Sequence, residues 1–417
     1  MYDAVVVGAR CAGASTAMLL ARQGWRVLLA DKDVFPSDRL SSHFIHPSGI
    51  VQLRDWGLLD DLVASGCPAM EEMTLDFGAF ALHGRPTPLD GVRAHYAPRR
   101  IVLDDLLVRA AAAAGADLHE GLRVRELVWD DGRVVGIRAT GRSDARVEAR
   151  ARVVIGADGP HSTVARAVGA PVHRAHPRLT CAYYGYWRDV ESRGVVLYAR
   201  PGGMVAEFQT NDDSTVVYVA WPQARFPEVR RDVDNAFMRQ VDHIAPDLAA
   251  RLQHGVRSEP IRGSGSLDNF MRRSAGRGWA LAGDAAAHKD PYLASGISDA
   301  LRDAHLLTAA LNVALDGRSS IDDALRDYDL RRTAAIEPLF ELNAQLATLQ
   351  PPPPDLAAHL ASLVDDQAAI DRFLGAISGT LPLHDVLPAL PAARADLPRS
   401  DAPTRADSPT ASPTTAT

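Results

Sequence analysis

Two apolar runs near the start of the chain flank a stretch of small residues. Residues 4–7 and 26–30 have the length and apolar content of buried strands. Residues 13–23 between them are mostly small or good helix-forming residues such as Ala and Leu, and predict a helix. A strand, helix and strand in this order predict a β-α-β unit with parallel strands.

The pattern further along the chain mixes helices with many short strands. Helices are predicted at 48–64, 102–114 and 296–315, and strands at 73–82, 118–120, 123–129, 134–138, 153–156 and 279–282. Asp131-Gly132 predicts a hairpin between two of these strands. Residues 180–221 are rich in aromatic and β-branched residues and predict a second sheet. More helices follow to about residue 377.

Composition narrows the class of protein. The 417 residues carry a formal charge of −7, so a basic nucleic-acid-binding domain is not expected. Three scattered cysteines, Cys11, Cys67 and Cys181, predict neither disulfides nor a zinc site, and no other metal-ligand spacing stands out. Asp3 precedes the first apolar run, and no run reaches the roughly 18 apolar residues of a membrane span. We therefore expect a cytoplasmic protein without an integral membrane segment.

A glycine turn follows the first predicted strand. Gly8 and Gly13 stand on it, and such a turn leaves backbone N–H groups at a helix N-terminus that can hold a pyrophosphate. Arg10 occupies the middle glycine position of G-x-G-x-x-G, so the motif is incomplete and fits either NAD or FAD. Asp31 ends the second strand, where an acidic side chain can bind ribose hydroxyls; a turn-forming role is the alternative.

Two later strand ends also carry Gly and Asp. Gly156-Ala157-Asp158-Gly159 follows the strand at 153–156, and Gly283-Asp284 follows the strand at 279–282. Gly296 then opens a second helix, whose N-terminus could stabilise negative charge on a reduced flavin ring. A second helix N-terminus has no role for NAD alone, so the late motif favours FAD.

These three markers, in this order, resemble the FAD-dependent monooxygenases of the para-hydroxybenzoate hydroxylase type, also called group A flavoprotein hydroxylases. Their geranylgeranyl-reductase-like relatives are similar too, and the resemblance covers about residues 2–315. It implies an α/β fold: a Rossmann-like FAD-binding domain of the glutathione-reductase type, an inserted β-sheet substrate lobe and C-terminal helices.

The implied domain organisation is discontinuous. The FAD-binding domain is expected to comprise residues 1–75, 96–180 and 262–330, and the β lobe residues 76–95 and 181–261. C-terminal helices would occupy residues 331–392. Residues 393–417 are mostly Pro, Ser, Thr, Ala and Asp, a composition that cannot bury a core, and predict a disordered tail.

The resemblance also implies which residues bind FAD. Asp31 would bind the adenosine ribose, Val124 would contact adenine through its backbone, and Arg100 would reach the phosphate and ribityl region. Asp284 would bind ribityl or phosphate oxygens, and the N–H groups of residues 296–297 would meet the pyrimidine end of the ring. The full expected set is Gly8, Ala9, Cys11, Ala12, Gly13, Asp31, Lys32, Arg39, Arg100, Val124, Asp158, Gly283, Asp284, Pro291, Gly296 and Ile297.

The loop before the second helix departs from the family pattern. The histidine of the late Gly-Asp motif is displaced by one residue, to His288, and Lys289 after it is one of only two lysines in the chain. Pro291 would lie at the flavin edge where oxygen is handled. Pro291, His288 and Lys289 are therefore the candidate catalytic residues. The alternative is that His288 and Lys289 shape the loop and pair with Asp290 or Asp299.

Aromatic residues of the β lobe supply candidates for the substrate pocket. Tyr184 and Tyr186 share one face under the period of two, and with Tyr292 they are expected to line the pocket; core packing is the alternative. The resemblance implies that NADH or NADPH docks transiently and reduces FAD. O₂ would then form a C4a-hydroperoxide that oxygenates an apolar or aromatic small molecule.

Two other functions stay open on the sequence alone. One is an FAD-dependent reductase of isoprenoid-type double bonds, and the other is a non-catalytic flavin-binding protein. A flavin halogenase is disfavoured because the chain has no Trp-x-Trp-x-x-Pro segment.

Overall fold

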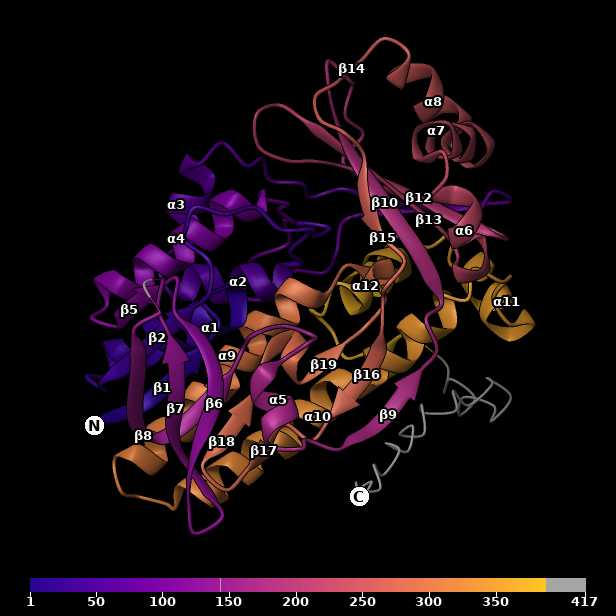
Figure 1. Cartoon of the computed structure of the whole chain (residues 1–417). Helices are drawn as coiled ribbons and strands as arrows, with labels where there is room; N and C mark the ends of the chain where they lie inside the picture. Colours follow the sequence, from indigo (N-terminus) through magenta and orange to yellow (C-terminus); the bar gives the residue numbers. More distant parts are fainter. Residues whose placement is uncertain (143, 388–417) are drawn as a thin grey trace, which may run out of the picture.

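A mainly parallel sheet contains the N-terminal strand of the structure, a computed structural model that describes residues 1–142 and 144–387 (Figure 1). The strand order is β17-β18-β8-β1-β2-β5, and every neighbouring pair from β18 to β5 is parallel, whereas β17 is antiparallel. The strands are β1 (Tyr2–Val7), β2 (Val27–Asp31), β5 (Asp117–Glu120), β8 (Arg146–Gly156), β17 (Ala275–Gly276) and β18 (Trp279–Leu281). The predicted β-α-β unit is confirmed.

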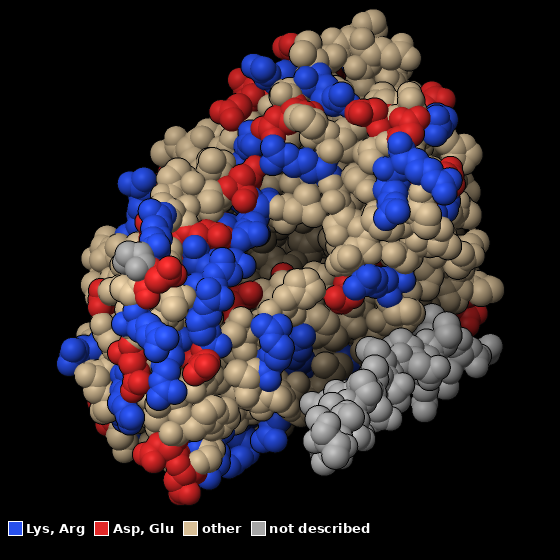
Figure 2. Space-filling view, in the orientation of Figure 1, with Lys and Arg blue, Asp and Glu red and all other residues tan. Residues whose placement is uncertain are grey.

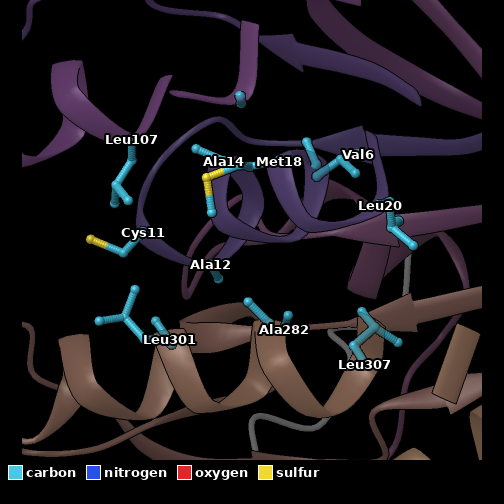
Figure 3. Close-up of a cluster of buried hydrophobic side chains, with 14 of the residues drawn as sticks. Val6, Cys11, Ala12, Ala14, Met18, Leu20, Leu107, Ala282, Leu301 and Leu307 are labelled. Atoms are coloured by element: carbon cyan, nitrogen blue, oxygen red, sulfur yellow. The ribbon is translucent and has the colours of Figure 1, made fainter. Parts of the chain in front are cut away.

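Three helices cover one face of this sheet. They are α1 (Cys11–Arg22), α4 (Arg100–Ala113) and α9 (Gly296–Leu315). Figure 3 shows α1 and α9 facing one another, with Ala12 on the side of α1 that is turned toward Leu301 of α9. Small residues fill the buried side of α1, so the two helix backbones approach closely, and the core between them is apolar.

A meander of antiparallel strands lies beside this sheet. Strands β6 (Arg123–Asp130) and β7 (Arg133–Thr140) form the predicted hairpin, in which Asp131 and Gly132 both have positive φ, as a type I′ turn requires. The first half of β8 pairs with β7 and its second half pairs with β1. One long strand therefore joins the meander to the parallel sheet.

A second sheet has the order β14-β10-β13-β12-β11-β3-β4, with β15 also paired to β10. Its strands are β3 (Met73–Asp76), β4 (Ala81–Gly84), β10 (Thr180–Arg188), β11 (Val195–Arg200), β12 (Gly203–Gln209), β13 (Thr215–Pro222), β14 (Val256–Arg257) and β15 (Arg262–Ser264). A small third sheet consists of β9 (Val172–His176), β16 (Asn269–Arg272) and β19 (Ala287–His288). The predicted second sheet is confirmed, between segments of the parallel one.

The two faces of the second sheet pack against different helices. Tyr183 and Trp187 pack on one face in the cluster that contains α7 and α8, whereas Tyr184 and Tyr186 pack on the other face with the C-terminal helices. The period of two predicted this separation. The remaining helices are α2 (Pro47–Asp55), α3 (Leu59–Ala64), α5 (Thr163–Ala167), α6 (Phe226–Val229), α7 (Val233–Ile244), α8 (Pro246–Leu252), α10 (Ile321–Leu346), α11 (Pro354–Ser362) and α12 (Gln367–Ile377).

Several boundaries differ from those expected. The helix predicted at 48–64 is two helices, because Gly57 takes a positive φ between α2 and α3. The strand predicted at 73–82 is the hairpin of β3 and β4, since the chain turns at Gly78. By contrast, the helix predicted at 296–315 has the same bounds as α9.

The expected domain boundaries also cut through elements of the structure. The boundary at 75/76 falls inside β3, the segment assigned to the FAD domain from 262 begins with β15 of the second sheet, and the boundary at 330/331 falls inside α10. Strand pairing decides these memberships, and a linear sequence does not display it. The predicted tail at 393–417 lies outside the described residues. Among the described helices, none combines the length and apolar character needed to cross a membrane.

Gly13 allows the contact between α1 and the glycine turn. A Cβ at this position would lie 1.8 Å from the carbonyl oxygen of Gly8, closer than any real contact, and backbone atoms cannot give way cheaply. We expect Gly13→Ala to cost at least about 2 kcal/mol of folding free energy, or to abolish folding. Chemical unfolding of the apoprotein measures this. Gly141→Ala is the matched control, because its Cβ would meet only the Ala145 oxygen at 3.8 Å; equal stability of the two variants would contradict the expectation.

Candidate functional site

A long cavity of about 590 Å³ lies at the carboxyl ends of the parallel strands. Val7 at the end of β1, Asp31 at the end of β2 and Asp158 just after β8 all line it. The cavity continues past Asp284 to the start of α9. We call it the strand-end cavity. Ligands of parallel α/β sheets bind in this position, outside the carboxyl ends of the strands. Figure 2 shows the surface hollowed near the middle of one face, with Lys and Arg side chains gathered along one side.

The glycine turn forms one wall of the cavity. Gly8 has φ +100°, and a Cβ there would lie 2.4 Å from the Ala157 carbonyl oxygen, so only glycine fits between β1 and β8. Arg10 has an ordinary negative φ and directs its guanidinium to the carboxylates of Asp33 and Asp104. The middle position of the motif therefore needs no glycine, because the arginine side chain is held by these two carboxylates.

Asp31 connects the end of β2 to this turn. Its Oδ2 accepts a hydrogen bond of 2.6 Å from the Ala9 N–H, and its Oδ1 accepts one of 2.8 Å from the Asp33 N–H. Lys32 and Val124 line the cavity beside it. A carboxylate oxygen can accept more than one hydrogen bond, so Asp31 can also bind a ligand hydroxyl from here.

Arg100 and Asp284 lie across the middle of the cavity. The Arg100 guanidinium makes an ion pair of 2.9 Å with Asp104 one turn along α4. Burial acts to lower the pKa of Arg100, but the carboxylates of Asp104 and Asp284 act to raise it, so the guanidinium stays charged. The Asp284 side chain is exposed in the cavity. This part of the wall therefore presents one cation and one carboxylate.

Two predicted cofactor residues, Asp158 and Cys11, are further described by their hydrogen bonds and by their pKa, respectively. Asp158 accepts hydrogen bonds from the Ser162 hydroxyl (2.5 Å) and the Thr163 N–H (2.7 Å), and so holds the start of α5. Cys11 is buried, and burial raises the pKa of its thiol to about 12, which excludes a reactive thiolate.

Residues 290–295, which we call the junction loop, bring the far end of the cavity to the start of α9. The Asp290 N–H donates to Asn269 Oδ1 (2.6 Å), and the Asp290 carbonyl accepts from Asn343 Nδ2 (2.8 Å). The Leu293 N–H donates to Asn343 Oδ1 (3.0 Å), and the Leu293 carbonyl accepts from His46 Nε2 (2.8 Å). Hydrogen bonds from three separate elements thus fix this loop.

His288 and Lys289 lead into the junction loop and line the strand-end cavity. His288 Nδ1 donates to the Asp268 carbonyl, and Lys289 makes a buried ion pair with Asp299 of α9. The Lys289–Asp299 pairing is one that the loop-shaping alternative predicted. Asp290 is buried, and burial raises the pKa of its carboxyl to about 6 although the Thr180 hydroxyl donates to it at 2.6 Å.

A second cavity of about 480 Å³ adjoins the first, and most of its lining is apolar. Ser42, Tyr218, Pro291 and Ala294 line both cavities, so these four residues form the junction between them. We call the second one the apolar cavity. Alternating residues of β3, β11 and β12 form one wall, and helices α10, α11 and α12 form another.

Cross-strand pairing gives the length of this apolar wall. One row of directly paired residues crosses the second sheet through Tyr184, Tyr218, Ala206, Leu197 and Leu75. Tyr184 lines the strand-end cavity, Tyr218 lines both cavities, and the last three line the apolar cavity. Adjacent strands lie about 4.8 Å apart, so the row extends about 14 Å from Tyr218 to Leu75. The apolar cavity is therefore long enough for a multi-ring or extended apolar molecule.

The structure brings most of the predicted site together. All predicted cofactor residues line the strand-end cavity except Ala9 and Gly13. The Ala9 N–H is bonded to Asp31, and Gly13 packs under the Gly8 carbonyl, so these two support the turn from behind. Arg39 lines the cavity and pairs with Asp33.

The three residues predicted to line the substrate pocket do not all line one cavity. Tyr292 lines the apolar cavity and Tyr184 lines the strand-end cavity, but Tyr186 lines neither. The Tyr186 hydroxyl shares a hydrogen bond with His43, and the Arg99 guanidinium covers its ring at 4.8 Å from the ring centre. These neighbours separate Tyr186 from both cavities, so it is a core residue.

Sequence reasoning missed the C-terminal helices as a cavity wall and Arg332 of α10 as a residue of the strand-end cavity. The only available signals were the apolar periodicity of those helices and one arginine among many, and neither identifies a partner in space.

Comparisons with known proteins agree with this geometry. Residues 1–342 match the family described as FAD binding domain. Among curated relatives, a 1H-pyrrole-2-carbonyl-(peptidyl-carrier protein) brominase of Pseudoalteromonas luteoviolacea is 24% identical over 76% of this chain and 78% of its own. A 6-methylpretetramide 4-monooxygenase of Streptomyces rimosus is 26% identical over 72% and 73%. A digeranylgeranylglycerophospholipid reductase of Methanospirillum hungatei is 27% identical over 79% and 80%.

Solved structures share the fold. The myxobacterial chondrochloren halogenase CndH superposes with a TM-score of 0.77 at 20% identity, over 93% of this chain and 98% of its own. PqsL, a probable FAD-dependent monooxygenase from Pseudomonas aeruginosa, superposes with a TM-score of 0.72 at 19% identity, over 89% and 99%. A brominase and a halogenase are thus among the proteins that this chain resembles, although its sequence lacks the Trp-x-Trp-x-x-Pro segment. Since the family match spans most of the chain, the protein belongs to the FAD binding domain family and is an FAD-dependent oxidoreductase.

Proposed function

We propose that FAD lies along the strand-end cavity, with adenosine at the Asp31 end and the isoalloxazine ring against the junction loop. The start of α1 would hold the pyrophosphate through its free N–H groups, assisted by the charge of Arg100. Asp284, exposed midway along the cavity, would accept hydrogen bonds from ribityl hydroxyls. The ring then lies at the end where the strand-end cavity meets the apolar cavity.

The space around two glycines, Gly8 and Gly296, supports this placement. Side chains are excluded at Gly8 by the Ala157 carbonyl, whereas a Cβ at Gly296 would meet nothing within 4 Å. Gly296 therefore faces open space at the start of α9, where a flat ring can approach the backbone. The helix N-terminus there favours negative charge on the ring.

We further propose that the protein is a monooxygenase for apolar small molecules, with NADH or NADPH as a transiently bound reductant. The observation that carries this proposal is the apolar cavity, which adjoins the strand-end cavity and shares Tyr218 and Pro291 with its lining. FAD supplies the chemistry of hydride acceptance and oxygen activation when bound. The chain excludes water with its apolar walls and places the substrate beside the ring.

Reduction of an isoprenoid-type double bond is the second candidate. The relative from Methanospirillum hungatei bears the name of such a reductase, and an apolar wall of about 14 Å would accommodate part of an isoprenoid chain. The two functions differ in their need for O₂, which makes them separable by experiment.

Oxygen consumption separates the candidates. With NADH or NADPH, we expect aromatic or isoprenoid compounds to stimulate O₂ uptake by the purified holoprotein and to yield a product heavier by one oxygen atom. Anaerobic saturation of a double bond would favour the reductase, and a brominated product that appears only with added bromide would favour halogenation. If neither nucleotide reduces the flavin, the proposed reductant is wrong.

Asp284 tests the placement of FAD. We expect Asp284→Ala to weaken FAD binding at least tenfold and to purify largely as apoprotein, because the ribityl contact is lost. The ratio of flavin absorbance to protein measures the FAD content. Asp60→Ala, at an exposed position of α3, is the control and should keep its flavin. Stoichiometric flavin in Asp284→Ala would refute the placement.

Ala206 tests the substrate pocket. It lies in the middle of the apolar wall, so Ala206→Phe should occupy the space of a substrate without touching the strand-end cavity. We expect unchanged FAD content and at least a tenfold loss of substrate-stimulated O₂ uptake, with Ala206→Val intermediate. Full stimulation in Ala206→Phe would show that substrate binds elsewhere.

A further inference from the structure

A chain of buried charged residues lies under the ring end of the strand-end cavity. Lys289 pairs with Asp299, and Asp299 Oδ1 also pairs with Arg302 at 2.7 Å. Arg302 lies 3.4 Å from Asp303, whose Oδ2 pairs with Arg332 at 2.8 Å. We call these five residues the charge chain. It joins Lys289, the residue before the junction loop, to the first two turns of α9 and to helix α10.

The charge chain carries an excess of positive charge. It contains three cations and two carboxylates, and most of these side chains are almost fully buried, with Arg332 at 1% exposure and Asp303 at 0%. Nη1 and Nη2 of Arg332 have no hydrogen-bond partner among the described residues, nor does Nε of Arg302. Such groups are costly to bury without a partner, so their positive charge is not fully neutralised from within the protein.

The excess charge lies next to the cavity that we assign to FAD. Lys289, Asp299, Asp303 and Arg332 all line the strand-end cavity. Asp299 is in the first turn of α9, beside the backbone of Gly296 that faces the cavity. The chain therefore lies on the same side of the ring as the α9 N-terminus, and its charge adds to the partial positive charge of that terminus.

Asp290, which follows Lys289 and lines the same cavity, offsets part of this charge, because burial raises the pKa of its carboxyl only to about 6; the charge of Lys289 itself remains. Burial acts to raise the pKa of Asp299, but Lys289 and Arg302 hold it well below its usual value, so this carboxylate stays ionised. Burial lowers the pKa of His46, which packs nearby, to about 4, so its imidazole is neutral. Asp284 lies farther along the cavity, where Arg100 faces it.

We propose that Lys289, as part of this charge chain, raises the reduction potential of the bound FAD by stabilising the negative charge of the reduced ring. The inference rests on the proposed placement of the ring at the junction loop. Reduction adds electrons to a ring in a site of low dielectric, where a nearby net charge acts strongly because water does not screen it. Lys289 thus acts on the ring through its charge, and it need not form a bond to the substrate.

Removal of the lysine charge tests the proposal. We expect Lys289→Met to weaken the binding of reduced FAD about tenfold more than it weakens the binding of oxidised FAD. The two-electron potential then falls by about 30 mV. Equilibration of the holoprotein with reference dyes measures the potential. Lys289→Arg keeps the charge, so its preference for reduced over oxidised FAD should stay within about twofold of that of the wild type. Arg318→Met removes an exposed cation beyond the C-terminal end of α9, outside both cavities, and should not shift the potential.

A second substitution distinguishes an effect of charge from an effect of loop structure by the direction in which it shifts the reduction potential. Asp299→Asn removes a negative charge and should raise the potential, and the double variant Lys289→Met with Asp299→Asn should return close to the wild-type value. A purely structural ion pair would instead lower FAD affinity and stability in both single variants without opposite shifts in potential.

Two failures are distinguishable. If the wild-type protein does not bind FAD, the proposed function is wrong. If the variants bind FAD stoichiometrically but their potentials equal that of the wild type, or Asp299→Asn and Lys289→Met shift in the same direction, the role of Lys289 is wrong and the placement of FAD stands.

Discussion

The paired hydrogen bonds of Asn343 with the junction loop hold the functional region together. This buried amide donates to the Asp290 carbonyl and accepts from the Leu293 N–H, so helix α10 fixes two loop residues on either side of Pro291. Asn269 of β16 and His46 at the start of α2 complete the set. Because the loop forms part of the junction between the two cavities, its position determines where a ligand of one cavity meets a ligand of the other.

The same region contains features that lower the stability of the folded protein. Ala294 of the junction loop has a positive φ, which is uncommon for a residue with a side chain. The charge chain beside it buries five ionised groups, although apolar packing of similar volume is often no less stable. Strain and buried charge of this kind persist where the surrounding structure fixes them, and here they lie at the proposed ring end of FAD.

The two cavities are built from different parts of the fold, and this allows proteins of similar fold to differ in reaction. The strand-end cavity is built from turns, strand ends and helix starts, which suit a dinucleotide of fixed shape. The apolar cavity is lined by side chains of the second sheet and of the C-terminal helices, which can change without disturbing that scaffold. Brominase, monooxygenase and reductase are all names of relatives of this chain, and the fold alone does not select among these reactions.

The sequence by itself determined the parts of the protein that depend on local rules. The β-α-β unit, the Asp131-Gly132 hairpin and helix α9 follow from periodicity and turn chemistry, and three strand-end motifs in order indicated FAD. Only the tertiary structure decided the junction loop, the charge chain and the apolar cavity. Asn343 and Arg332 act through partners about 30 to 50 positions away, and Tyr186 was excluded from the pocket by His43 and Arg99. Contacts between distant segments arise when packing brings their elements together, and no local pattern of residues encodes which partner each side chain will meet.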